Sequence, residues 1–374
     1  MKLDLDIEQF WRDEEHAHDE NCFSKSAAQV ALGIRMSDEC VFAELGEEGD
    51  PWGYTPPERR LDLNRRYNEK AIAIVGRPLL SEAPPPPADS VFPAFRQIGE
   101  VFGGKYVFDG KTTWLQGSIS DNEALEKKLN EIDRTDLRAF ILPPNWEAEK
   151  KRIFETYGKK PPLFTHIRGP VTLATSVFGV ENLIFLLYDE PELAERFADT
   201  IARVVIFYFD LFQEEAGFDR SNFVHGFSVA DDNCALLDPD LYHAFGLRIL
   251  RKIFDHTAPD PGDRRYQHSD SAMEHLLPDL ATLRLTGCNF GPTVTVDKIR
   301  RYMKDTCIQG CLAPFTFMSN DEEAIIAEVR RDCEAAKQDD IRGLNLATAG
   351  SINNGSLLTS MRAVMAAIQN YGRY

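Results

Sequence analysis

Short apolar runs alternate with longer amphipathic segments along most of the chain after about residue 135. Short runs that are apolar throughout are typical of buried strands, and apolar residues that recur every three or four positions indicate helices. With one earlier run included, the pattern predicts eight strands, at Val41–Glu44, Leu137–Leu142, Leu163–Ile167, Asn222–Phe227, Arg265–His268, Thr282–Cys288, Thr306–Leu312 and Leu344–Ala347.

Helical patterns follow seven of these predicted strands, most clearly at Pro191–Glu215, Pro239–His256, Val296–Lys304, Asp321–Ala336 and Ser356–Tyr371. Eight strand–helix units of roughly 45 residues each account for the length of the chain and predict a (β/α)8 TIM barrel. A doubly wound open sheet is the alternative, but no G-x-G-x-x-G motif or P-loop follows the first predicted strand. We therefore expect one α/β barrel domain over residues 1–374, with residues 1–38 as an N-terminal helical extension.

The chain is acidic, with 42 Lys and Arg residues against 60 Asp and Glu residues and a formal net charge of −18. Such a surface repels phosphate backbones, so nucleic-acid binding is not expected. No stretch approaches the ~18 consecutive apolar residues of a membrane span, and the start of the chain lacks the apolar core of a signal peptide. The sequence therefore predicts a cytoplasmic protein without membrane contact, in which the 7 cysteines serve as thiols or metal ligands.

Polar side chains gather at the ends of the predicted strands. In a (β/α)8 barrel the chemistry takes place at the C-terminal ends of the strands, so these side chains are candidates for a shared site. They are Glu44, His166, Arg168, His225, Asp231, Asp232, His268, Asp270, Cys288 and Cys311.

Several motifs between about residues 160 and 374 carry a family resemblance. Gly169–Ala174 reads GPVTLA, Leu237–Pro239 opens a helix with LDP, and Gly310–Pro314 reads GCLAP. His268 stands in QHSD, and the chain closes with YGRY. These segments resemble the G-x-P-x-T-L-A turn, the S-P-x-x-F segment, the G-N-L-D-P turn, the His of H-x-C-G and the tail of the uroporphyrinogen decarboxylase superfamily. The resemblance implies the same barrel.

One departure from the family pattern bears on the reaction. Uroporphyrinogen decarboxylases carry an Arg-Gln-x-Gly-Arg-Tyr loop after the first strand, which holds propionate groups, whereas the corresponding region here reads AELGEEGDPWGYTPPE. Acidic residues repel the carboxylates that arginine would bind. The resemblance therefore favours the other branch of the superfamily, the zinc-dependent methyltransferases that act with corrinoid proteins or thiols.

The methyltransferases of anaerobic O-demethylation in that branch use one acidic and two cysteine ligands, a pattern that Glu274, Cys288 and Cys311 match. Zinc accepts thiolate, imidazole and carboxylate ligands, and a catalytic site keeps one position open. His268, Asp270 and Glu44 remain alternatives for the third ligand, because an acid in a first helical turn, such as Glu274, is ordinary dipole complementarity. Each cysteine could also be a small core residue.

The resemblance implies that zinc polarises the leaving oxygen of a methyl ether while a corrinoid protein supplies the methyl acceptor. The predicted function is methyl transfer from a methylated small molecule, an aromatic methyl ether, to that protein. The rival functions are a metal-independent decarboxylase or lyase on the same barrel, and a barrel that binds a tetrapyrrole without catalysis.

The remaining candidates divide by role. His225 or His268 is a candidate general acid, with Asp231 and Asp232 as its acidic partners or as substrate contacts. The candidate substrate-binding residues are Glu44, Arg168, Trp52 and Tyr54.

Overall fold

The computed structural model describes residues 3–108, 112–338, 341–350 and 355–374. Within these residues a seven-stranded sheet has the strand order β1-β9-β8-β7-β6-β5-β4. The pairs β1/β9, β8/β9, β7/β8 and β4/β5 are all parallel. Helices separate the strands, so the chain has an α/β fold consistent with the predicted (β/α)8 barrel. The strands are β1 (Ala31–Leu32), β4 (His166–Arg168), β5 (Phe227–Ala230), β6 (Arg265–Ser269), β7 (Gly287–Phe290), β8 (Cys307–Leu312) and β9 (Leu344–Thr348).

The chain divides into two compact units, which we describe separately. Unit 1 comprises residues 1–85, 267–277 and 284–374, and unit 2 comprises residues 86–266 and 278–283. Unit 1 therefore contains β1, β7, β8, β9 and the end of β6, whereas unit 2 contains β4, β5 and the start of β6.

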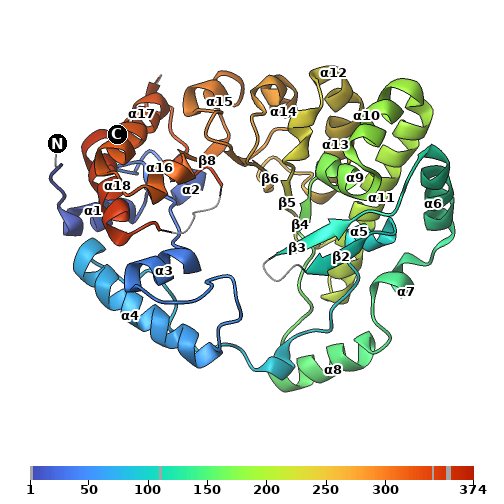
Figure 1. Cartoon of the computed structure of the whole chain (residues 1–374), viewed down its shortest axis with the longest axis horizontal. Helices are drawn as coiled ribbons and strands as arrows, with labels where there is room; N and C mark the ends of the chain where they lie inside the picture. Colours follow the sequence, from blue (N-terminus) through green and yellow to red (C-terminus); the bar gives the residue numbers. More distant parts are fainter. Residues whose placement is uncertain (1–2, 109–111, 339–340, 351–354) are drawn as a thin grey trace. The chain divides into compact units, whose positions relative to one another are not determined.

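Unit 1 joins the two ends of the chain. Gln369 exchanges two hydrogen bonds with the backbone of Asp6, both 2.9 Å long, and Figure 1 shows the N and C labels close to each other. Helices α17 and α18 pack side by side near both ends (Figure 1). The helices of unit 1 are α1 (Ile7–Glu14), α2 (Asp19–Cys22), α3 (Asp38–Leu45), α4 (Pro57–Val75), the 3-10 helix η4 (Glu274–Leu276), α15 (Val296–Tyr302), α16 (Pro314–Met318), α17 (Glu322–Ala336) and α18 (Leu358–Tyr371).

Unit 2 has an aromatic core around its longest helix, α11 (Pro191–Glu215). Phe212 of α11 packs edge-on against the buried Trp146, with the ring centroids 6.0 Å apart. The other helices are η1 (Ala88–Ser90), α5 (Ile98–Val101), α6 (Asn122–Arg134), α7 (Leu137–Ile141), α8 (Trp146–Tyr157), α9 (Pro170–Phe178), α10 (Val180–Asp189), η2 (Asn233–Leu236), α12 (Pro239–Tyr242), the π-helix η3 (His243–Leu247), α13 (Arg248–Thr257) and α14 (Leu277–Ala281), the last beginning at a residue of unit 1. A separate antiparallel hairpin pairs β2 (Lys105–Phe108) with β3 (Thr113–Gln116).

Two of the eight predicted strands are wrong. The run Val41–Glu44 lies in helix α3, which ends at the left-handed Gly46 (φ 65°). The run Leu137–Leu142 lies in helix α7 and its C-cap, where the carboxylate of Asp136 accepts a hydrogen bond from the N–H of Ala139 at 3.1 Å. In both segments the capping residues favour a helix, and the apolar side chains face a core from a helix rather than a strand.

The other strand predictions overlap observed strands, but three of them are displaced. The strand predicted at Leu163–Ile167 begins only at His166, the strand predicted at Asn222–Phe227 begins only at Phe227, and the strand predicted at Thr282–Cys288 begins only at Gly287. The predicted helices at Pro191–Glu215, Pro239–His256, Val296–Lys304, Asp321–Ala336 and Ser356–Tyr371 are confirmed to within a few residues. Of the described helices, none alone is long and apolar enough to cross a membrane, although the bent pair α9 and α10 has the length and composition to do so.

Candidate functional site

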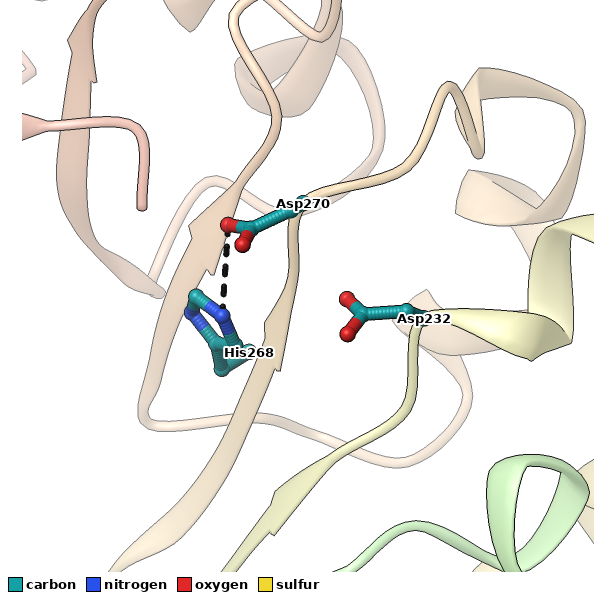
Figure 2. A group of neighbouring side chains, drawn as sticks. All are labelled: Asp232, His268 and Asp270. Atoms are coloured by element: carbon teal, nitrogen blue, oxygen red, sulfur yellow. Dashed lines mark ion pairs between the residues drawn. The ribbon is translucent and has the colours of Figure 1, made fainter. Parts of the chain in front are cut away.

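An imidazole and a carboxylate meet at the C-terminal end of β6. His268 is the fourth residue of the strand, and Asp270 follows its last residue. Nε2 of His268 lies 3.3 Å from Oδ1 of Asp270, as the dashed line in Figure 2 shows. The side chains are 27% and 54% exposed, so a solute can reach both. Figure 2 also labels Asp232, a residue of unit 2 that we describe with that unit.

The other nitrogen of the His268 ring contacts β7. Nδ1 of His268 lies 2.9 Å from Oδ1 of Asn289. The amide of Asn289 is 7% exposed and donates from Nδ2 to the carbonyls of Gln309 and Thr348, on β8 and β9. The N–H of Gly350 donates to Oδ1 of Asn289 at 3.1 Å. Hydrogen bonds from three neighbouring strands therefore fix the orientation of the His268 ring.

The lack of a side chain at Gly350 leaves room for the carboxylate of Asp270. A Cβ atom at position 350 would lie 2.3 Å from Oδ1 of Asp270, and the φ angle of +98° also disfavours any other residue. Glycine at this position after β9 therefore allows Asp270 to approach the backbone.

Asp231 and Asp232 follow β5 in unit 2, and the carboxylate of Asp231 is hydrogen-bonded to groups of the protein itself. Its carboxylate is completely buried and accepts hydrogen bonds from the N–H of Val171 (3.2 Å) and from the N–H and Oγ1 of Thr172 (both 2.8 Å). It thereby caps the N-terminus of α9, within the GPVTLA motif. Burial raises the pKa of Asp231 to about 6, although these hydrogen bonds lower it. Asp232 is half-buried and precedes η2.

Arg168 and His225 lie at opposite ends of their strands. Arg168 is the last residue of β4, at the strand end predicted from the sequence, and its side chain is exposed. His225 precedes the first residue of β5 by two positions, so it lies at the amino end of the strand. Its Nδ1 atom is buried without a hydrogen-bond partner. The expectation that His225 belongs to the C-terminal edge is wrong, because the strand begins five residues later than the sequence pattern predicts.

The structure does not bring Glu274, Cys288 and Cys311 together. Glu274 pairs with Nζ of Lys298 at 2.6 Å. Cys288 lies opposite Ile308 in the β7/β8 register. Cys311 is three residues further along β8, which corresponds to about 10 Å. Among the described residues, no cysteine belongs to a group of three His, Cys, Asp or Glu side chains that are close enough to share an ion.

Both cysteines of that set are completely buried, and burial raises the pKa of each thiol. Sγ of Cys311 points at the carbonyl of Val294, at 3.5 Å. The environments of Cys288 and Cys311 are those of core thiols.

Three candidate substrate-binding residues, Glu44, Trp52 and Tyr54, lie in the first 60 residues of the chain. Glu44 accepts the N–H of Leu358 at 2.9 Å and pairs with Nζ of Lys70 at 3.3 Å, so it links α3 to α18 and α4. Because Val41–Glu44 is helical, the expectation that Glu44 ends a strand is wrong. Trp52 and Tyr54 lie in the loop before α4 and are 61% and 88% exposed.

Sequence reasoning missed Asn289 and Gly350. A sequence feature was available for Asn289, since a lone amide within the strand Gly287–Phe290 must find hydrogen-bond partners when it is buried. Gly350 follows a predicted strand with no distinguishing pattern of its own.

Comparison with known proteins identifies the family. A family model described as uroporphyrinogen decarboxylase (URO-D) matches residues 100–371, so the chain belongs to this family. A methyltransferase from Methanosarcina mazei has a similar fold, with 18% sequence identity, 92% of this chain and 94% of that chain covered, and a TM-score of 0.55. A B12-independent methionine synthase from Shewanella sp. W3-18-1, in complex with selenomethionine, has 13% identity, 71% and 72% coverage and a TM-score of 0.33. No curated protein matches the chain.

Proposed function

We propose that this chain is a zinc-dependent methyltransferase that moves a methyl group from a small molecule, an aromatic methyl ether, to a corrinoid protein. The observation that carries the proposal is the approach of His268 Nε2 to Asp270 Oδ1 at the C-terminal end of β6. Enzymes with (β/α)8 folds use this end of the strands for chemistry. The fold shared with the methyltransferase from Methanosarcina mazei supports the reaction class.

The residues at the end of β6 fit a zinc ion. Imidazole nitrogen and carboxylate oxygen are both zinc ligands, at ~2.0–2.2 Å from the metal. Two such ligands of one tetrahedral ion are about 3.4 Å apart, and His268 Nε2 and Asp270 Oδ1 are separated by 3.3 Å. When bound, zinc would supply Lewis-acid polarisation of the ether oxygen from which the methyl group departs.

The chain's own residues have defined tasks in this proposal. His268 and Asp270, both in unit 1, hold the metal. Arg168, exposed at the end of β4 in unit 2, remains the candidate contact for an anionic group of the substrate. We prefer this ligand set to Glu274, Cys288 and Cys311 because Glu274 is paired with Lys298 and both thiols are buried.

Metal content and methyl transfer test the proposal together. The full chain is stripped with a chelator, reloaded with zinc, and mixed with an aromatic methyl ether and a corrinoid protein reduced to Co(I), whose absorbance reports methylation. We expect about one zinc ion per chain and transfer that requires both the metal and the corrinoid protein. The His268→Gln and Asp270→Asn variants should lose zinc at least tenfold more readily than the wild type.

Three control variants separate the two ligand sets. Glu274→Gln, Cys288→Ser and Cys311→Ser should keep zinc and activity, and loss of zinc from these variants alone would reverse the ligand assignment. Product formation that survives chelation and needs no corrinoid protein would identify a decarboxylase or lyase instead. Binding of the tetrapyrrole without any methyl transfer would identify a non-catalytic barrel.

A further inference from the structure

We infer that Asn289 is a positioning residue that keeps a proton on Nδ1 of His268, so that Nε2, which faces Asp270, is the ring atom available to a metal ion. The metal-binding consequence of this inference rests on the proposed function. The tautomer itself follows from the hydrogen bonds around Asn289.

The orientation of the Asn289 amide is determined by its neighbours. A side-chain amide has two N–H donors on nitrogen and only acceptor sites on oxygen. One end of the amide faces the carbonyl oxygens of Gln309 and Thr348, which can only accept, so this end is the nitrogen. The other end receives the N–H of Gly350 at 3.1 Å, so it is the oxygen.

The amide oxygen in turn determines the proton of the ring. Oδ1 of Asn289 lies 2.9 Å from Nδ1 of His268, and two acceptors at that distance repel each other. Nδ1 must therefore carry a proton and donate it to Asn289. In a neutral imidazole the second nitrogen, Nε2, then has a lone pair and no proton.

This tautomer creates a demand for a cation at the end of β6. On a neutral ring of this tautomer, the lone pair of Nε2 would face a carboxylate oxygen of Asp270 at 3.3 Å. Only a positive centre shared by the two atoms makes their approach favourable, and a metal ion or a second ring proton meets this need. Histidines that bind metals commonly donate their other N–H to a carbonyl or carboxylate, and loss of that partner weakens metal binding about 10- to 100-fold.

Asn289→Ala and Asn289→Asp, with Asn345→Ala as the matched control, test the inference. Asn345 lies on β9 of the same unit, and its Oδ1 atom is buried without a hydrogen-bond partner. Nitrogen-15 shifts of labelled histidines in the metal-free full chain report the tautomer of each ring. Comparison with His268→Gln assigns one of the 8 histidines to position 268. Titration with zinc alone gives the affinity of each variant.

In the wild type and in Asn345→Ala we expect His268 protonated at Nδ1. In Asn289→Ala we expect loss of that preference and a zinc affinity at least tenfold lower. Asn289→Asp retains an acceptor for Nδ1, although its carboxylate cannot donate to Gln309 and Thr348, so it should keep the Nδ1 proton. A wild-type His268 with its only ring proton on Nε2 would overturn the inference even where neither variant folds. An unchanged tautomer in Asn289→Ala, or loss of the Nδ1 proton in Asn289→Asp, would overturn the inference. A wild type that binds no zinc would refute the proposed function and leave the tautomer comparison intact.

Discussion

At the scale of single residues, Asp231 has a structural role that its position in the sequence does not indicate. It is an acid at the end of a parallel strand, which is where catalytic acids of barrel enzymes are found. Its carboxylate nevertheless accepts three hydrogen bonds from the first turn of α9 and is shielded from solvent. Gly169 packs so closely against it that a Cβ atom there would lie 2.2 Å from the Cβ of Asp231. The carboxylate therefore stabilises the start of α9.

The pKa of Asp231 predicts a pH-dependent stability. The folded-state pKa of about 6 lies above the ~3.9 of an unfolded aspartate. Between these values the folded chain binds more protons than the unfolded chain, so the free energy of unfolding falls as the pH rises from about 4 to about 6. The decrease due to this group amounts to roughly 3 kcal/mol. Urea denaturation should therefore show a smaller decrease in Asp231→Asn than in the wild type.

Asp121→Asn is the control with the opposite sign. Asp121 caps α6, and the N–H of Ala124 lowers its pKa, so its contribution to stability increases as the pH rises. Replacing Asp121 should remove an increase, whereas replacing Asp231 should remove a decrease. Identical pH profiles for Asp231→Asn and the wild type would show that Asp231 is ionised throughout this range in the folded chain.

At the scale of elements, the sequence predicts best the helices and strands whose own residues determine their structure. Helix α11 begins with Pro191 at its first position and runs for 25 residues, long enough for its apolar period to be clear. Strands β1 and β4 have only 2 and 3 residues, too few for an alternating pattern. These strands exist because of their partners in the sheet, which are distant in sequence. The apolar run of α3 is ambiguous for the same reason, and only Gly46 indicates its helix end.

The same reasoning explains how much of the candidate site was predictable. His268 and Asp270 were accessible to sequence reasoning because β6 was predicted nearly to the residue. His225 was misplaced and Cys288 was assigned to the wrong end of its strand because β5 and β7 begin later than their apolar runs. Asn289 was missed because its importance comes from β8 and β9, which contact it only in the folded chain.

Arg300 connects helix α15 to the loops before β8 and β9. Its guanidinium is buried and donates to four backbone carbonyls, those of Met303, Thr306, Arg342 and Gly343. The carbonyl of Gly343 also accepts the N–H of Ile308 at 2.8 Å, and the other three carbonyls lie just after a helix or just before a strand, where regular structure leaves carbonyls without a partner. One side chain thus supplies donors to all four carbonyls.

Arg300→Lys should destabilise the chain strongly. An ammonium group has three donors on one nitrogen and cannot match the planar array of a guanidinium, so buried carbonyls lose their partners. We expect a loss of at least ~2 kcal/mol in the free energy of unfolding, measured by urea denaturation. Arg301→Lys, at the exposed neighbouring position, should change it by less than about 0.5 kcal/mol. Equal effects of the two substitutions would contradict the role assigned to Arg300.

At the scale of the whole molecule, the two ends of the chain stabilise each other within unit 1. The N–H of Val30 donates to the carbonyl of Gly372 at 2.8 Å, and the N–H of Tyr374 donates to the carbonyl of Ala28 at 3.1 Å. The guanidinium of Arg342 lies 4.0 Å from the centre of the Tyr374 ring. Val30 immediately precedes β1, which pairs with β9. The last residues of the chain therefore hold the first strand of the sheet in its register.

Ending the chain after Tyr371 should therefore weaken unit 1 far from the deletion. The deletion removes three backbone hydrogen bonds, the cation–π contact and the ion pair between Arg373 and Asp13, which predicts a decrease of at least roughly 2–3 kcal/mol in the free energy of unfolding. Tyr374→Ala removes only the ring and should cost about 1 kcal/mol. Urea denaturation measures both, and hydrogen exchange should show faster exchange at the N–H of Gly33, which donates to Leu346 of β9 at 2.7 Å. If the shortened chain unfolded at the wild-type urea concentration with unchanged exchange at Gly33, the prediction would be wrong, and pairing with β9 alone would be enough to hold β1 in the sheet.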